Sequence, residues 1–277
     1  FKWAGADVDH FIALKEEVND IKVLDQSYRI PGGPIHELSQ NIINKVQNRF
    51  DKDYKPRDDE GILKRYSDIT QVDMSKGNWL VLSSANYFLD DAKDLCEIQG
   101  WYYQFKGRNS IPLKLLMALN NWEAWRKDAQ LNHLEIKNIY EYLGSHVLPG
   151  FQKGKTLHSD TKYLMRDCRA EHGLVTDSVW YEAFEGLDPM TETYIRNMRA
   201  NGEMINKNPR IIMSTIHGAK GGEADKVLLM QDITNAALET FSHDPDELHR
   251  LFYTGATRAK RELHVLDPRD FDRAYIL

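Results

Sequence analysis

Short apolar runs alternate with amphipathic stretches along most of the chain. Uninterrupted apolar runs of this length are typical of strands buried on both faces of a sheet. They occur at residues 21–25, 79–84, 102–105, 210–215, 226–232 and 262–267. Between several of them, apolar residues recur three and four positions apart, as they do on one face of a helix, for example in 34–50 and 87–99. The pattern predicts an α/β fold with a parallel sheet covered on both faces.

The middle of the chain has a different pattern. From 111 to 208 it shows helical periodicity and little strand character, with helices predicted at 111–127, 131–144 and 191–202. Glycines at the ends of helical segments, such as Gly100, are predicted to terminate them. We therefore expect a sheet built from residues 1–110 and 209–277, interrupted by a mainly helical insertion over 111–208. The charged stretch 49–61 is expected to be a solvated loop.

Composition narrows the class of protein. The 277 residues are 42% hydrophobic and 28% charged, with a net charge of -6, so any contact with nucleic acid would need a local basic surface. Two cysteines, Cys96 and Cys168, suit a reducing cytoplasm, and no apolar run has the length of a membrane span. The chain starts without methionine and in mid-pattern, which suggests a piece of a longer protein.

The segment 244–266 carries helix-start signals followed by an arginine among small residues. Asp244 is a candidate N-cap, Pro245 suits the first helical position, and Glu247 makes a capping box possible. Gly255 inside this helix costs about 1 kcal/mol relative to alanine, so we expect a close approach of another backbone or a ligand there. Arg258 follows the helix and precedes a strand. Its spacing alone fits either a surface arginine near a helix C-terminus or a residue at the edge of a cleft.

A glycine-rich turn joins the strands predicted at 210–215 and 226–232. Gly218, Gly221 and Gly222 permit a backbone conformation in which successive N–H groups face a phosphate. Three further side chains of the turn are hydrogen-bond donors: Thr215, His217 and Lys220. The alternative is a tight connection that needs glycine only for its shape.

Two other patterns resemble binding sites, but each lacks a residue that such a site requires. The sequence Gly154-Lys155-Thr156 resembles the end of a phosphate loop, but the glycine required five residues earlier is Pro149. Cys168 and His172 lie one helical turn apart without a second pair of ligands, so no metal site is predicted.

Taken together, TIHGAKGGEADKVLL (215–229) and RLFYTGATRAKRELHVL (250–266) resemble motifs V and VI of the UvrD/Rep/PcrA family of superfamily-one DNA helicases. FKWAGADVDHF (1–11) is similar to the tail of motif III, VLDQSYRIPGGPI (23–35) to motif IV, and 79–107 to the segment that follows it. The resemblance implies that 1–110 and 209–277 form a RecA-like, P-loop-NTPase-like lobe called 2A. Residues 111–208 have the position of the 2B insertion but not its sequence.

In that family, ATP lies between two RecA-like lobes. The resemblance implies that Arg29 and Arg258 reach the γ-phosphate, that Tyr28 packs beside the adenine, and that Glu223 lies near the ribose, with Gly221 in the nucleotide-binding loop. Arginines supplied from a second lobe are worth about 10³–10⁵ in rate in well-studied phosphoryl transfers. The phosphate loop and the Mg²⁺ ligands are expected in a missing N-terminal lobe, so the chain alone is expected to be inactive.

Single-stranded DNA is the implied polymer substrate. Trp3 matches a tryptophan that stacks on a base, and Thr215, His217 and Lys220 match residues near the DNA backbone. Trp3 as a core aromatic and His217 as a residue that holds the turn stay open as alternatives.

The chain departs from the family pattern at a few positions. Ala4 stands where arginine is usual, Gly222-Glu223-Ala224 replaces Leu-Glu-Phe, and Ser83 replaces another arginine. We therefore expect the details of DNA contact to differ from the family pattern, as in a divergent member, for example a phage-encoded one.

The sequence thus predicts the C-terminal part of an ATP-dependent DNA helicase or translocase of repair or replication. The alternative is a helicase-like module that binds DNA or protein without hydrolysing ATP.

Overall fold

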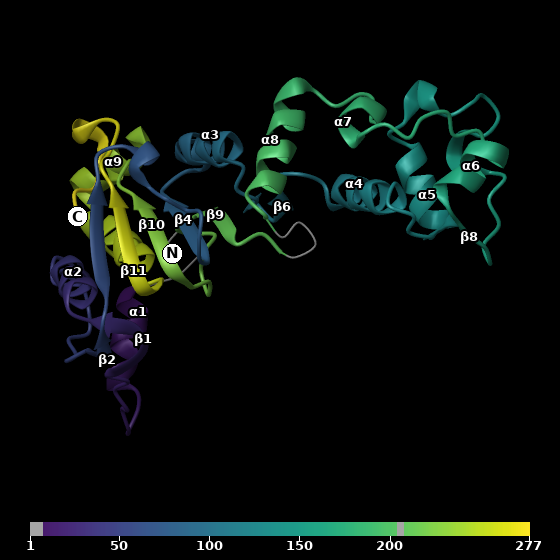
Figure 1. Cartoon of the computed structure of the whole chain (residues 1–277). Helices are drawn as coiled ribbons and strands as arrows, with labels where there is room; N and C mark the ends of the chain where they lie inside the picture. The colour runs from purple at the N-terminus through teal and green to yellow at the C-terminus, as the bar shows by residue number, and fades with distance from the viewer. Residues whose placement is uncertain (1–7, 204–207) are drawn as a thin grey trace. The chain divides into compact units, whose positions relative to one another are not determined.

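The computed structural model describes residues 8–203 and 208–277 (Figure 1). The chain divides into two compact units, each considered separately. The first comprises the described residues up to Cys96, with Tyr103–Lys106 and Arg210–Leu277. The second comprises Glu97–Tyr102 and the described residues of Gly107–Pro209, where the sequence led us to expect an insertion over 111–208.

The first unit is built on a mostly parallel sheet. Within this unit its strand order is β3-β11-β10-β4-β9-β5, and each neighbouring pair is parallel. Figure 1 shows β4, β10 and β11 side by side. The strands are β3 (Ile62–Tyr66), β4 (Trp79–Ser83), β5 (Tyr103–Phe105), β9 (Ile211–Thr215), β10 (Ala224–Met230) and β11 (Ala259–Leu266), whereas the short β6 (Arg108–Asn109) belongs to the second unit. The predicted α/β fold with a parallel sheet is confirmed.

Helices and a second, small sheet complete this unit. A parallel pair is formed by β1 (Gln26–Gly32) and β2 (Lys55–Glu60). The α-helices are α1 (Val8–Ala13), α2 (Pro34–Ile43), α3 (Asp90–Gln99), α9 (Asn235–His243) and α10 (Pro245–Ala256). Short 3-10 helices lie at η2 (Leu14–Glu16), η3 (Ile69–Gln71), η4 (Asn86–Leu89) and η7 (Phe271–Arg273).

Three sequence predictions in this unit are wrong. No strand forms over 21–25, and the expected loop at 49–61 contains β2. The side chains of β2 are mostly exposed, so this strand depends on backbone hydrogen bonds to β1 and carries no apolar pattern. The helix expected over 34–50 ends at Ile43, although Val46 beyond it is still buried.

One face of the large sheet packs on α2 and α10. Alternate residues of β4, β10 and β11 point to this face, and their apolar side chains join Ile35 and Ile42 of α2 and Leu248 and Phe252 of α10 in one core. The strand residues are Leu80, Leu82, Val227, Leu229, Leu263 and Val265. The amphipathic pattern of both helices therefore follows from this one contact.

Helix α10 begins and packs differently from the prediction. Asp244 is the N-cap residue, as the sequence indicated, but it makes no side-chain capping hydrogen bond, so the capping box that the sequence made possible does not form. Asp246 accepts hydrogen bonds from the backbone N–H groups of Gln47 and Asn48, at 2.8 and 2.9 Å. A Cβ atom at Gly255 would lie 3.0 Å from Leu229 Cδ1 and 3.4 Å from Ile216. The expected close approach exists, but core side chains make it.

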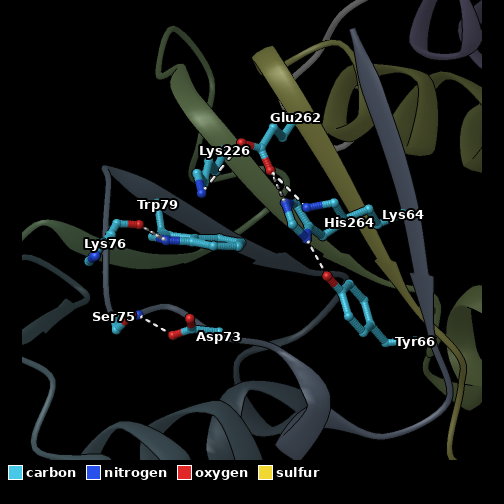
Figure 2. A network of polar contacts seen from close by, with 9 residues as sticks. All are labelled: Lys64, Tyr66, Asp73, Ser75, Lys76, Trp79, Lys226, Glu262 and His264. Carbon is cyan, nitrogen blue, oxygen red and sulfur yellow. Dashed lines mark hydrogen bonds and ion pairs between the residues drawn. The ribbon is translucent and has the colours of Figure 1, made fainter.

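The opposite face of the sheet carries a network of polar contacts (Figure 2). His264 is 3% exposed and stacks on Tyr66, at 5.6 Å between ring centroids. Its Nε2 lies 3.0 Å from Glu262 Oε2, and its Nδ1 lies 3.1 Å from the Tyr66 hydroxyl. Lys64 and Lys226 each lie 3.4 Å from the same carboxylate. A neutral His264 that donates from Nε2 and accepts at Nδ1 satisfies both neighbours.

The second unit is mainly helical. Its α-helices are α4 (Leu113–Trp125), α5 (His133–Tyr140), α6 (Met165–Glu171), α7 (Trp180–Ala183) and α8 (Pro189–Ala200). The short antiparallel strands β7 (Leu131–Asn132) and β8 (Lys162–Tyr163) pair, and η5 (Gly144–His146) and η6 (Gln152–Gly154) are single 3-10 turns. Trp122 and Trp125 of α4 meet edge to face in its core. Cys168 lies in α6, as expected of an ordinary helical residue.

We predict that Gly100→Ala destabilises the protein much more than Gly107→Ala. Both glycines have positive φ, +70° and +74°, which costs an L-residue about 1–2 kcal/mol. A Cβ atom at Gly100 would also lie 2.5 Å from the backbone of Asn197 in α8, whereas Gly107 has open space. Urea denaturation should show an additional loss of about 1–3 kcal/mol for Gly100→Ala. Equal losses would contradict the close packing of Gly100 on α8.

His264 should make stability depend on pH. Burial lowers the pKa of His264 below its ordinary value of 6.5, although Glu262 opposes this effect. The unfolded chain then binds a proton more readily, so stability is complete above about pH 6.5 and declines as the pH falls below it. His264→Gln should flatten this decline in chemical denaturation between pH 5 and 7. The exposed His243→Gln serves as the control, and an equally steep decline in both variants would rule out this role.

Candidate functional site

The residues expected at the nucleotide come together at the amino-terminal ends of β10 and β11. Glu223 directly precedes β10, and Arg258 stands between the end of α10 and the start of β11. The two strands are parallel, with Ala224 paired to Ala259, so their first residues must share one edge of the sheet. Arg29 in β1 reaches the same place, where its Nη1 lies 3.8 Å from Glu223 Oε2.

Arg258 is held by uncharged acceptors. Its Nε donates to the carbonyl of Thr254 at 3.0 Å, and its Nη1 donates to the carbonyl of Gly222 at 3.3 Å. Burial lowers the pKa of Arg258, the positive charge of Arg29 acts in the same direction, and Glu223 opposes both. Arginine nevertheless stays charged in proteins. The guanidinium is thus fixed in direction, with a charge that these two carbonyl groups do not neutralise.

Glu223 forms the main carboxylate contact of this cluster. Its Oε1 lies 2.6 Å from Lys260 Nζ, and the hydrogen bond from Lys260 is the largest cause of the lowered pKa of Glu223. Arg29 and Arg258 contribute smaller attractions in the same direction. One carboxylate therefore faces three cations, which leaves the cluster positively charged and suited to an anion.

Arg29 has one buried donor without a partner in the described structure, and two positions near it in the proposed site are open. The Nε atom of Arg29 is buried, and it has no hydrogen-bond partner among the residues that the structure describes. Tyr28, the next residue, is 86% exposed and available for stacking. Gly221 has φ +86°, and a Cβ atom there would meet nothing within 4 Å. This side of the loop is open.

The residues expected at DNA lie in the turn that follows β9. Thr215 is the last residue of that strand, and its Oγ1 accepts a hydrogen bond from the Gly218 N–H at 3.1 Å. His217 lines a cavity of about 370 Å³ together with residues of α1, α2 and α10, and burial lowers its pKa. Lys220 is exposed. Trp3, the expected stacking residue, and Ala4 lie outside the described residues.

Two further cations lie near Arg29, Glu223 and Arg258, and neither was predicted from the sequence. Lys260, two residues beyond Arg258, is the partner of Glu223, and the alternation of Arg258 and Lys260 at the start of β11 was the available signal. Arg57 donates from Nη2 to the carbonyl of Lys260 at 2.7 Å, and its Nε is also buried without a partner within the described part of the chain. Arg57 lies in the segment that was expected to be a loop.

The mostly parallel sheet flanked by helices is consistent with a RecA-like lobe. Residues 186–267 match the family model of the UvrD-like helicase C-terminal domain, so this part of the chain is similar to the C-terminal part of UvrD-like superfamily-one helicases. The match includes Glu223 and Arg258 as well as the turn after β9, whereas Arg29 precedes it. A search of curated proteins gave no match. The matched domain supports DNA binding of the helicase type.

The described residues were also compared with the requirements of a metal site and of a membrane-spanning helix. Within residues 8–203 and 208–277, no three histidine, cysteine or acidic side chains are grouped so that they could hold a metal ion. None of the described helices is long and apolar enough to cross a membrane.

We predict that Lys260→Met raises the pKa of Glu223 toward its ordinary value of 4.5, because the largest cause of its lowering is then removed. NMR titration of the side-chain carboxyl carbons would measure this change. Lys226→Met is the matched control, since Lys226 pairs with Glu262 and should leave the pKa of Glu223 unchanged. An unchanged Glu223 pKa in Lys260→Met would mean that the ion pair is not maintained in solution.

Proposed function

We propose that this chain forms one lobe of an ATP-dependent DNA helicase or translocase that acts on single-stranded DNA. In this proposal, a second RecA-like lobe of the same protein carries the phosphate loop and the Mg²⁺ ligands. The observation that carries the proposal is the convergence of Arg29 and Arg258 beside Glu223. These residues come from elements far apart in the sequence and meet at one exposed edge of the sheet.

The cluster fits the terminal phosphate of ATP. Phosphoryl transfer spreads negative charge over the equatorial oxygens, and positive groups already in place stabilise that charge. Arg258 is oriented by two backbone carbonyls, and the buried Nε of Arg29 lacks an acceptor in the described structure. Both guanidinium groups can therefore donate to phosphate without first breaking an ion pair closer than 3.8 Å. Mg²⁺, when bound with ATP, would neutralise further phosphate charge.

The other residues have matching roles in this proposal. Tyr28 packs against the adenine, Glu223 binds near the ribose, and Gly221 lets the loop approach the nucleotide. Thr215, His217 and Lys220, with Trp3, contact single-stranded DNA. Residues 216–223 join the end of β9 to Glu223, so the proposed DNA contacts and Glu223 lie on one short connection. This short connection offers a physical route by which DNA affects ATP hydrolysis.

The test is ATP hydrolysis by the protein that contains this chain together with its complementary lobe. Single-stranded DNA should stimulate turnover, and Arg258→Ala should lower kcat by about 10³-fold or more while nucleotide binding is largely retained. Arg29→Ala should act in the same direction. The control is Arg261→Ala, an exposed arginine of β11, the strand that begins directly after Arg258.

Each outcome of this test has a distinct meaning. If Arg258→Ala leaves ATP hydrolysis unchanged, the protein is still an ATP-dependent helicase or translocase, but the proposed role of Arg258 is refuted. Absence of turnover in the native protein, with DNA binding retained, would favour a helicase-like binding module.

A further inference from the structure

We propose that Lys260 is a positioning residue of the nucleotide site, which holds the carboxylate of Glu223 away from Arg29 and Arg258 and so keeps both arginines available to phosphate. This inference rests on the proposed function. It assigns a role to a residue that lies within the segment similar to motif VI but to which the resemblance gave no role.

The geometry places a competing anion inside the site. Glu223 forms an ion pair with Arg29, at 3.8 Å, and it attracts Arg258 as well. A carboxylate and a phosphate oxygen make the same kind of charge-assisted hydrogen bond with a guanidinium. An unrestrained Glu223 would therefore occupy the arginines that phosphate needs. Because it belongs to the chain, its local concentration is always high.

Lys260 offers Glu223 a better partner. The Lys260 Nζ to Glu223 Oε1 distance is 2.6 Å, far shorter than the separation from Arg29. Lys260 lies on β11, two residues beyond Arg258, so the phosphate-directed arginine and the lysine that restrains its competitor are carried by the same short segment at the start of the strand. Arg57 Nη2 donates to the Lys260 carbonyl at 2.7 Å and fixes the strand at this point.

The number of cations beside Glu223 explains why Lys260 is needed to keep the arginines available to phosphate. When Lys260 is present, it neutralises the charge of Glu223, and neither of the two arginines proposed to contact phosphate is needed for this. Without Lys260, the only cations left beside this carboxylate in the described cluster are the two arginines. Removal of one lysine should therefore weaken ATP binding through Glu223. The alternative is that Lys260 contacts phosphate directly, which predicts an effect independent of Glu223.

A double-mutant cycle in the same two-lobe protein separates these possibilities. Lys260→Met should raise KM for ATP about tenfold, the size of one charge-assisted hydrogen bond, with kcat at saturating ATP within about twofold of native. Lys260→Arg should retain the native KM. In a Glu223→Gln background, Lys260→Met should change KM by less than about twofold, because the competing carboxylate is gone. Calorimetric titration with the slowly hydrolysed analogue AMP-PNP should show the same pattern in Kd.

Several results would overturn the inference. An equal rise in KM in the Glu223→Gln background would mean that Lys260 binds phosphate directly, and an unchanged KM and Kd in Lys260→Met would remove its role. A fall in kcat with loss of thermal stability would indicate a merely structural residue. Each of these results requires native turnover, whereas failure of the proposed function is the absence of that turnover.

Discussion

The parallel pairing of β10 and β11 is the constraint on which the candidate site depends. Because Ala224 pairs with Ala259, the residues just before each strand, Glu223 and Arg258, lie at the same edge. Beyond a register shift that follows this pair, the two strands are held by the core, where Val227 pairs with Leu263 and Leu229 with Val265 and all four pack on α2 and α10. A shift of one residue in either strand would turn these side chains to the other face. The edge of the sheet that carries Glu223 and Arg258 is therefore positioned by the burial of apolar side chains from β10 and β11.

Two charged clusters on this sheet differ in how completely they are satisfied. Around Glu262, two lysines and a buried histidine surround the carboxylate, and Tyr66 completes the hydrogen bonds of His264 (Figure 2). Around Glu223, Arg258 has only carbonyl acceptors, and Arg29 keeps a buried Nε without a partner in the described residues. The first arrangement stabilises a fold, whereas the second has capacity left for a ligand.

The turn after β9 and the helix before Arg258 are in direct contact. Ile216 packs where a side chain at Gly255 would lie, so the loop that carries His217 rests on α10, the helix that leads to Arg258. His217 also shares a cavity with Glu247 and Leu251 of α10. Since packed interiors transmit small shifts, DNA bound at the turn and phosphate bound at Arg258 would act on the same helix.

The sequence by itself determined the α/β class, most strands of the large sheet and the family resemblance around Glu223 and Arg258, because these features lie in local apolar patterns and contiguous motifs. Tertiary structure alone decided which charges meet. Strand β2 has no apolar pattern, so neither its pairing with β1 nor the arrival of Arg57 at Lys260 was predictable. The ion pair of Lys260 with Glu223 joins two segments that only the sheet brings together. The spacing of apolar residues along the sequence indicates which side chains are buried. The ion-pair partner of a partly exposed charged side chain depends instead on which strands pair and in what register.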